Sequence, residues 1–375
     1  MISKTMSRKL LMISTDRKIF EQGSTVRARQ AEYAKDWDEV HIIIFNKKKS
    51  GGIRGQEDGG GGQNGESVIA PNCWAYSTQS WIKLMYPFDA MRLGRFIIEK
   101  RGITEMTCQD ASLTAMAGIS FRKQFNIPLE IQVHEDIGSP NFGYTISNKI
   151  RKTLALSYLP KADKIRVVSN KIKDYLVGTL NIDVAKITVK PIFVDVEKIK
   201  NAPIIEGADL HKKYPQFEKI VLIASRLEKE KNIGMAIRAW AEVIKKLNEK
   251  NRKVGLVIVG DGSQFNTLKN LAGISDLTGQ TQANAGARFE SKKSGQSVIF
   301  ENWADKVTLI SNYKTADIFL NTSLFEGYGM TLVEAHAAGC KIISTDVGVA
   351  REVGAKIVGW NEGELVEVIV KELNK

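Results

Sequence analysis

Short apolar runs alternate with segments of helical periodicity along most of the chain. The runs at residues 9–14, 40–45 and 219–225 are apolar at nearly every position, which is typical of strands buried on both faces of a parallel sheet. Residues 23–35 and 232–247 instead place their apolar side chains at helical spacing. This alternation predicts the α/β class, with doubly wound and mostly parallel sheets.

The same patterns continue through both halves of the chain. Further strands are expected at residues 104–110, 129–133, 165–170, 254–259, 298–300, 316–321, 341–344 and 357–360, and further helices at 78–102, 171–180, 305–314, 330–338 and 363–374. Residues 200–216 contain two prolines, have little periodicity and mark the start of a second domain. We therefore predict two Rossmann-like domains, at residues 1–194 and 195–375, each long enough to bury its own core.

The stretch at residues 321–345 combines a buried strand, a loop, a helix start and another strand. The helix is expected to begin at Met330 and to stop at Gly339. Its first turn lies at the carboxyl edge of the sheet, beside Gly327 and Gly329. Unpaired backbone amides and the helix dipole at such a place favour a phosphate group.

Two carboxylates flank this expected anion site. Glu326 lies in the loop, and Glu334 lies about one turn into the helix. Carboxylates suit neutral hydroxyl groups and developing positive charge, so the arrangement predicts binding of a phosphorylated sugar. Two surface glutamates at a solvated helix start are the alternative.

Two cations follow the first strand of the second domain. Arg226 comes directly after the strand, and Lys231 stands just before the next helix. A guanidinium offers bidentate geometry and an ammonium a compact charge, so the two together can clamp a diphosphate. Lys229 and Glu230 are expected to be solvated surface residues, and a solvated basic turn is the alternative for the whole segment.

The run SLFEGYGMTLVEAHAAG resembles the E-x7-E motif of retaining glycosyltransferases of the GT-B fold, family 4 (glycosyl transferases group 1). The run SRLEKEKN is similar to the family segment that holds the donor phosphates. The resemblance covers nearly the whole chain, although most of the helices that brace the two domains in relatives are expected to be missing. It implies two domains facing each other across a cleft, and transfer of a sugar from a nucleotide-diphosphate donor to a hydroxyl with retained anomeric configuration.

The resemblance also implies a role for each candidate residue of the second domain. Glu326 would orient the donor sugar, and Glu334 would hold the ribose hydroxyls. The backbone amides near Gly329, Met330 and Thr331, together with the two cations, would stabilise the departing diphosphate.

His134 and Gly23 are the candidates in the first domain. His134 follows the strand at 129–133 and opens a polar loop, so it is expected to point toward the cleft, with a structural role as the alternative. The resemblance implies that His134 contacts the donor sugar near its reacting carbon, which makes it a catalytic candidate beside Glu326. It also places Gly23 near the donor diphosphate, although only one glycine is present here where many relatives carry two.

Composition and charge indicate which partners the protein can bind and in which cellular compartment it is expected. A net charge of +12 implies an acidic partner, such as a nucleotide diphosphate, an anionic or pyrophosphate-linked lipid, or nucleic acid. The three cysteines lie far apart and indicate neither a metal site nor a disulfide framework. The chain has no run of 18 apolar residues and its first residues do not resemble a secretory signal, so we expect a cytoplasmic protein.

Four other segments have compositions that bear on possible chemistry. Residues 78–102 interleave aromatic and basic side chains, which predicts either peripheral contact with the inner, anionic membrane face or an ordinary core helix. Residues 47–65 and 272–297 are expected to be loops. Residues 36–38 match D-x-D, the metal-binding signature of another glycosyltransferase architecture, but are expected to be surface charge in a turn.

The combined prediction is transfer from a UDP- or GDP-sugar to a glycan or lipid-linked glycan in cell-surface polysaccharide synthesis. No metal or other cofactor is expected, because Arg226 and Lys231 would replace it. A non-catalytic nucleotide-sugar-binding protein and a nucleotide-sugar epimerase of the same fold are the alternatives. A nucleic-acid binder, suggested only by the charge, ranks last.

Overall fold

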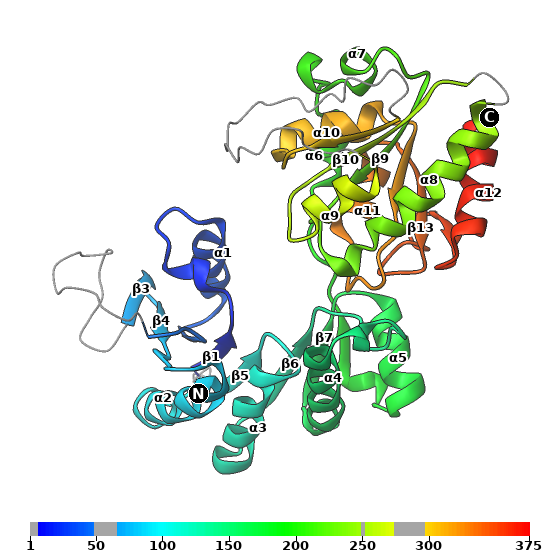
Figure 1. Ribbon diagram of the computed structural model, residues 1–375. Coiled ribbons are helices and arrows are strands. Elements are labelled where there is room, and N and C mark those ends of the chain that lie inside the picture. The colour runs from blue at the N-terminus through cyan, green and yellow to red at the C-terminus, as the bar shows by residue number, and fades with distance from the viewer. Residues whose placement is uncertain (1–6, 49–65, 249–251, 274–296) are drawn as a thin grey trace. The chain divides into compact units, whose positions relative to one another are not determined.

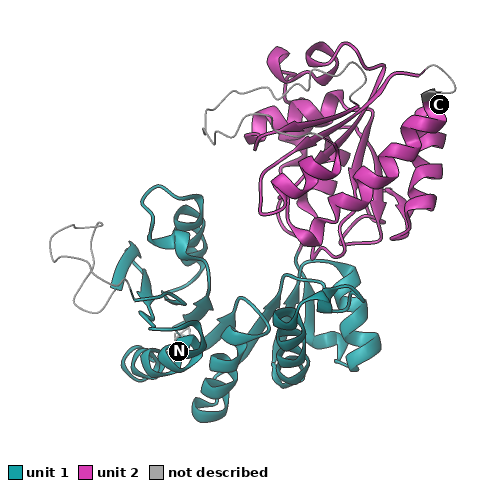
Figure 2. Ribbon diagram, viewed as in Figure 1, with its two compact units in different colours: residues 1–190 teal, residues 191–375 magenta. Residues whose placement is uncertain are grey.

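The computed structural model describes residues 7–48, 66–248, 252–273 and 297–375. The chain divides into two compact units, Met1–Lys190 and Pro191–Lys375 (Figure 2). The division lies close to the domain boundary predicted after residue 194. Most of the two loops predicted at 47–65 and 272–297 lies outside the described residues.

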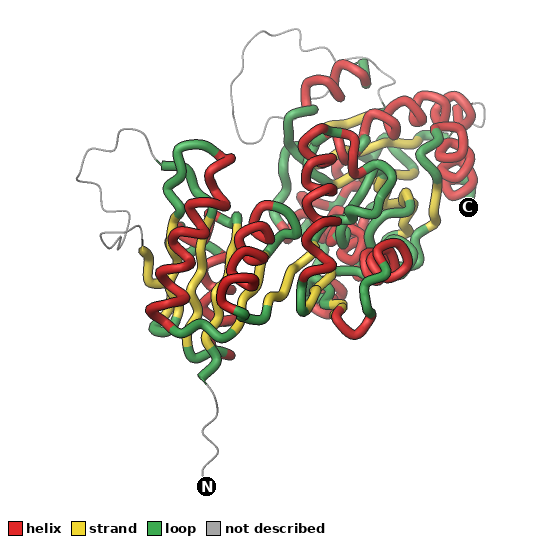
Figure 3. Tube along the Cα trace, turned by 90° about the horizontal axis from the view of Figure 1, so that it is seen from below, coloured by secondary structure: helices red, strands yellow, loops and turns green. Residues whose placement is uncertain are grey.

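The first unit is built on an eight-stranded sheet with the order β3-β4-β2-β1-β5-β6-β7-β8, whose strands lie side by side in Figure 3. The strands are β1 (Lys9–Ser14), β2 (Glu39–Ile44), β3 (Glu66–Ala70), β4 (Cys73–Ser77), β5 (Glu105–Cys108), β6 (Leu129–Val133), β7 (Lys164–Val167) and β8 (Ile187–Val189). Neighbours pair in parallel except for β3 and β4, which form an antiparallel hairpin at one edge. The winding direction reverses between β1 and β5, as in other doubly wound folds.

Helices cover both faces of this sheet. They are α1 (Thr25–Tyr33), α2 (Tyr86–Arg101), α3 (Leu113–Phe125), α4 (Ile146–Tyr158) and α5 (Asn170–Leu180). Figure 1 shows α1 on one side of the sheet and α2 and α3 on the other. Gly118 in α3 packs directly against the side chain of Leu129 in β6. Because side chains alternate along a strand, Glu130 and Gln132 point to the face away from α3.

The second unit holds a six-stranded sheet in the order β11-β10-β9-β12-β13-β14, with every neighbouring pair parallel. The strands are β9 (Lys219–Ala224), β10 (Val254–Val259), β11 (Val298–Glu301), β12 (Ile318–Asn321), β13 (Lys341–Thr345) and β14 (Lys356–Val358). The helices are α6 (Val196–Asn201), α7 (Leu210–Lys213), α8 (Ile233–Asn248), α9 (Phe265–Leu271), α10 (Lys306–Thr315), α11 (Met330–Ala337) and α12 (Glu362–Leu373). The winding direction reverses between β9 and β12.

The core of the second unit lies on both faces of its sheet. Val221 and Ile223 of β9 belong to a cluster with apolar residues of α8 and α12. Leu222 and Ala224 belong to a second cluster, with residues of α10 and α11. Since β9 is apolar on both faces, its continuous hydrophobic run follows from its place at the centre of the sheet. The prediction of two doubly wound α/β sheets is confirmed.

The sequence pattern missed five elements of the first unit, namely β3, β4, β8, α3 and α4. The hairpin strands β3 (ESVIA) and β4 (CWAYS) mix polar, aromatic and small residues. Strands at the edge of a sheet are less completely buried than central ones, so they lack the continuous apolar run that identifies β9.

The helix expected at 78–102 is also shorter than predicted. A 3-10 turn at Lys83–Met85 precedes α2, which begins at Tyr86. Pro87 lies in the first turn of α2, where its missing N–H breaks no helical hydrogen bond. Trp81, the single aromatic residue of the predicted segment before Tyr86, is therefore not part of the helix.

Candidate functional site

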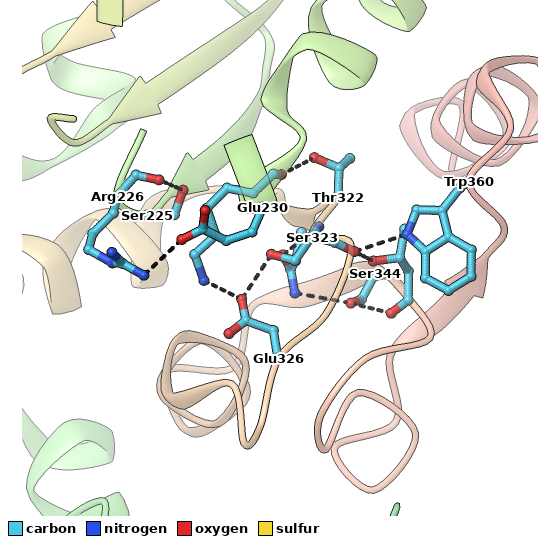
Figure 4. Close-up of polar contacts among 11 residues, drawn as sticks. Ser225, Arg226, Glu230, Thr322, Ser323, Glu326, Ser344 and Trp360 are labelled. Carbon is cyan, nitrogen blue, oxygen red and sulfur yellow. Dashed lines mark hydrogen bonds and ion pairs between the residues drawn. The ribbon is translucent and has the colours of Figure 1, made fainter. Parts of the chain in front are cut away.

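The carboxyl ends of β9 and β12 lie next to each other at the switch point of the second sheet, where doubly wound folds bind ligands. The loops that follow these strands are joined by hydrogen bonds (Figure 4). The Thr322 hydroxyl donates to the backbone carbonyl of Lys231 at 3.1 Å, and the amide of Leu324 donates to the carbonyl of Glu230 at 2.7 Å. The predicted phosphate segment and the predicted two-glutamate loop therefore form one site.

Lys231 and Glu326 form an ion pair within this site. The Lys231 Nζ lies 2.5 Å from Glu326 Oε1, and the two side chains are only 14% and 16% exposed. At such low exposure, water screens the pair weakly, and loss of one partner leaves the other charge poorly solvated. From the sequence, Lys231 is expected to bind the diphosphate and Glu326 the donor sugar, and a contact between the two side chains is not predicted.

The Ser323 hydroxyl lies within hydrogen-bond distance of the Glu326 carboxylate. Its Oγ lies 2.8 Å from Glu326 Oε1 and 2.7 Å from Asn321 Oδ1, and its single hydrogen can be donated to only one of them at a time. Figure 4 shows Trp360 pointing toward this loop, where its Nε1 donates to the Ser323 carbonyl at 3.0 Å. None of these three supports was predicted. The available signal was the change from apolar to polar residues at the end of β12.

A third loop, following β13, packs against the backbone of the Glu326 loop through Gly348. Gly348 has a φ of 50°, and a Cβ there would overlap the Tyr328 carbonyl oxygen and lie 3.3 Å from Cβ of Glu326. The next amide, of Val349, donates to that carbonyl at 2.9 Å. Only glycine fits this position, so the third loop fixes the path of the Glu326 loop.

Arg226 lies in the same site but is held by a different partner. Its guanidinium is 63% exposed and lies 3.0 Å from Glu230 Oε1, whereas the Glu230 side chain is only 18% exposed. The expectation that Glu230 is a solvated surface residue is therefore wrong, because its carboxylate orients Arg226 and its carbonyl receives the β12 loop. The turn after β10 holds the backbone next to Arg226, because the Asp261 carbonyl accepts a hydrogen bond from the Leu227 amide at 2.8 Å.

The start of α11 borders the same loop. Gly329 precedes the helix with a φ of 88°, and no described side chain caps the first turn. The amides of Met330 and Thr331 have no partner within the helix, as is general for a first turn. Glu334 lies one turn further on, where burial raises the pKa of its carboxyl, while Lys306, with its Nζ 3.8 Å away, acts in the opposite direction.

The other two candidates lie in the first unit. His134 directly follows β6 and lines a pocket with Asp110 and Ser112 at the carboxyl ends of the strands. His134 is exposed over the whole residue, but loss of water around the ring and the positive charge of Arg166 lower the pKa of His134 to about 4, so it is neutral at pH 7. Gly23 precedes Ser24, the N-cap of α1, and has a φ of 74°; a Cβ placed there would meet no atom within 4 Å.

Residues 209–368 match the family model for glycosyl transferases group 1. The chain is similar to alpha-monoglucosyldiacylglycerol synthase of Streptococcus pneumoniae, 26% identical over 238 residues, an alignment that spans 61% of this chain and 48% of that protein. The chain thus spans about half the length of this relative.

Two solved structures have a similar fold. Sucrose-phosphate synthase from Thermosynechococcus elongatus gives a TM-score of 0.69 at 17% identity, covering 98% of this chain and 90% of that one. A trehalose-6-phosphate structure from E. coli, bound with UDP-2-fluoro glucose, gives 0.66 at 16% identity, covering 97% and 91%. The predicted GT-B fold is confirmed by these similarities.

Proposed function

We propose that this chain, whose second unit carries a domain of the glycosyl transferases group 1 family, transfers a sugar from a nucleotide-diphosphate donor to a hydroxyl acceptor with retention of configuration. The observation that best supports the proposal is the meeting of Lys231 and Glu326 at the switch point, beside the uncapped start of α11. A cation and free amides suit a diphosphate, while a carboxylate suits sugar hydroxyls.

In the proposed reaction, negative charge grows on the diphosphate as its bond to the sugar breaks. Arg226, Lys231 and the amides of Gly329, Met330 and Thr331 stabilise that charge. Lys231 then shares its ammonium between phosphate oxygens and Glu326, which is free to turn its second oxygen to the donor sugar. These fixed groups do the work of a metal ion, so no metal or other cofactor is proposed.

The remaining candidates complete the proposed donor site. Glu334 holds the ribose hydroxyls, His134 contacts the sugar near its reacting carbon, and Gly23 lies near the diphosphate. The departing phosphate accepts the proton of the acceptor hydroxyl, so no protein base is assigned.

The proposed donor is a UDP- or GDP-sugar, and the fold neighbour bound with UDP-2-fluoro glucose favours UDP. The proposed acceptor is a glycan or lipid-linked glycan of cell-surface polysaccharide synthesis, in the cytoplasm. The similarity to a synthase named for a glucosylated diacylglycerol favours an acceptor that carries lipid.

Thermal stabilisation of the purified protein by nucleotide sugars tests the donor assignment. We expect one class among UDP-, GDP- and ADP-sugars to raise the melting temperature, because a ligand at 100 times its Kd stabilises the folded state by about 2.7 kcal/mol. Transfer of labelled sugar to an acceptor then distinguishes an enzyme from a non-catalytic nucleotide-sugar-binding protein. Conversion of the nucleotide sugar to another nucleotide sugar, with no acceptor present, indicates an epimerase. Absence of stabilisation by any nucleotide sugar contradicts the proposal.

Exposed apolar side chains occur just before α2 and in its first turn, in the first unit. Trp81, Leu84 and Phe88 are 72%, 74% and 60% exposed, and Lys83 lies among them in the sequence. The ammonium of Lys48 lies 4.8 Å from the Trp81 ring centroid. Within the described residues, no helix has the length and apolarity needed to cross a bilayer. We propose that this basic and apolar surface rests on an anionic membrane.

A vesicle-flotation experiment tests this contact. We expect the double substitution Trp81→Ser and Leu84→Ser to weaken binding to phosphatidylglycerol-containing vesicles at least about 10-fold, since burial of each such side chain contributes about 1.5–3 kcal/mol. The control is Val184→Ser, which removes another exposed apolar side chain of the first unit. Equal flotation of the double variant and the wild type, or no flotation of either, would show that this surface does not dock to lipid.

A further inference from the structure

A chain of hydrogen bonds leads from a carboxylate in the first sheet to His134. The Thr107 Oγ1 lies 3.1 Å from Glu130 Oε1, and Gln132 Nε2 lies 3.0 Å from that Thr107 hydroxyl. Gln132 Nε2 also lies 3.3 Å from Glu130 Oε1, and Gln132 Oε1 lies 3.1 Å from His134 Nε2. The four residues come from the adjacent strands β5 and β6 and from the residue that follows β6.

Only one arrangement of donors and acceptors places a hydrogen in every contact of this network. The Glu130 carboxylate can only accept, so in this arrangement the Thr107 hydroxyl donates to it. In the contacts given above, the donor that reaches both the Thr107 hydroxyl and the Glu130 carboxylate is the NH₂ of Gln132. The opposite orientation of the amide would set its oxygen against two oxygens with no hydrogen between them.

The burial of the chain makes this orientation persistent. Thr107 and Gln132 are both almost completely buried, on the sheet face away from α3. Water therefore cannot replace a lost partner, and an unsatisfied buried polar group is costly. The Gln132 carbonyl is thus fixed as an acceptor facing His134 Nε2.

We propose that Gln132 and Thr107 are positioning residues that hold neutral His134 in the tautomer with its hydrogen on Nε2. The Nδ1 atom then keeps its lone pair and can only accept a hydrogen bond. Resting on the proposed function, this assigns His134 as an acceptor for a hydroxyl of the donor sugar.

Nitrogen-15 NMR of histidine-labelled full-length protein reads the tautomer directly. The protein has 4 histidines, and the signal that disappears in His134→Gln is that of His134. We expect the wild type to carry its hydrogen on Nε2 of His134. Gln132→Met keeps the side-chain volume but removes the acceptor, so we expect a mixture of the two tautomers. Thr107→Val should produce a smaller change in the same direction.

Two further variants separate positioning from folding. Thr107→Ser keeps the hydroxyl and should retain the wild-type tautomer. Glu105 lies in β5 on the same side as Thr107, but its carboxylate pairs with Arg8 at 3.3 Å and takes no part in the hydrogen bonds that lead to His134. Glu105→Gln should therefore also leave the tautomer unchanged. A wild-type hydrogen on Nδ1, or wild-type histidine signals in Gln132→Met, would overturn the proposal.

Kinetics connects the tautomer to the reaction. We expect Gln132→Met to lower kcat about 3- to 10-fold, the effect of one lost hydrogen bond, with a smaller change in the KM of the donor. A changed His134 tautomer in Gln132→Met with an unchanged kcat would show that these hydrogen bonds play no part in sugar transfer. If no donor is turned over by the wild type, the proposed function fails, while the NMR result still decides the tautomer.

Discussion

Replacing Glu326 with glutamine is expected to lower kcat by about 10²- to 10³-fold, the usual loss when one electrostatic group of a reaction centre is removed. Glutamine has nearly the same shape, and its carbonyl oxygen can still accept from Ser323 and Lys231. The fold should therefore persist, while the negative charge that orients the donor sugar is lost. Initial rates of sugar transfer, measured at saturating donor, check this expectation.

The second unit offers a matched control for Glu326→Gln. Glu372 and Lys356 form an ion pair of the same length, 2.5 Å, in which the glutamate is 11% exposed. Glu372→Gln therefore removes a comparable carboxylate from the end of α12 without touching the site, and turnover should stay at the wild-type level. A rate for Glu326→Gln within twofold of the wild type would remove Glu326 from the catalytic centre.

Replacing Lys231 with methionine is expected to affect both stability and turnover. The substitution leaves the half-buried Glu326 carboxylate without its cation, which should lower the free energy of unfolding by about 1–3 kcal/mol. It also removes a fixed positive charge from the proposed diphosphate site, so kcat/KM should fall about 10²- to 10³-fold. Denaturant unfolding and transfer assays measure the two effects separately.

The double variant Lys231→Met with Glu326→Gln distinguishes the effect of Lys231 on stability from its effect on sugar transfer. Removing both charges should restore part of the stability lost in Lys231→Met, because no unpaired carboxylate remains. The transfer rate should not recover, since neither the cation nor the carboxylate is present. Recovery of transfer in the double variant would mean that Lys231 serves only to neutralise Glu326.

The central strands and the two glutamates could be predicted from the sequence because their signals are local. The apolar run of β9 follows from burial on both faces, and the spacing of Glu326 and Glu334 follows from a single loop and helix start. The short strands β3 and β4 gave no such signal, because an edge hairpin needs no continuous apolar run.

The contacts within the site could not be predicted in the same way. Lys231 and Glu326 are 95 residues apart, and nothing in either segment specifies the other as its partner. Glu230 stands in a run of alternating charges that is typical of a solvated turn. Its side chain is only 18% exposed, and its carbonyl accepts from Leu324 in the loop after β12, a contact that belongs to the tertiary structure.

The order of strands in the second sheet has a consequence for biosynthesis. β12 inserts beside β9, with Ile318 next to Val221, although β10 and β11 are made between them. In a nascent chain that ends at β11, the loop that carries Lys231 therefore has no Glu326 loop to pack against. The contact between Lys231 and Glu326 can therefore form only after β12 and the loop held by Gly348 have been synthesised.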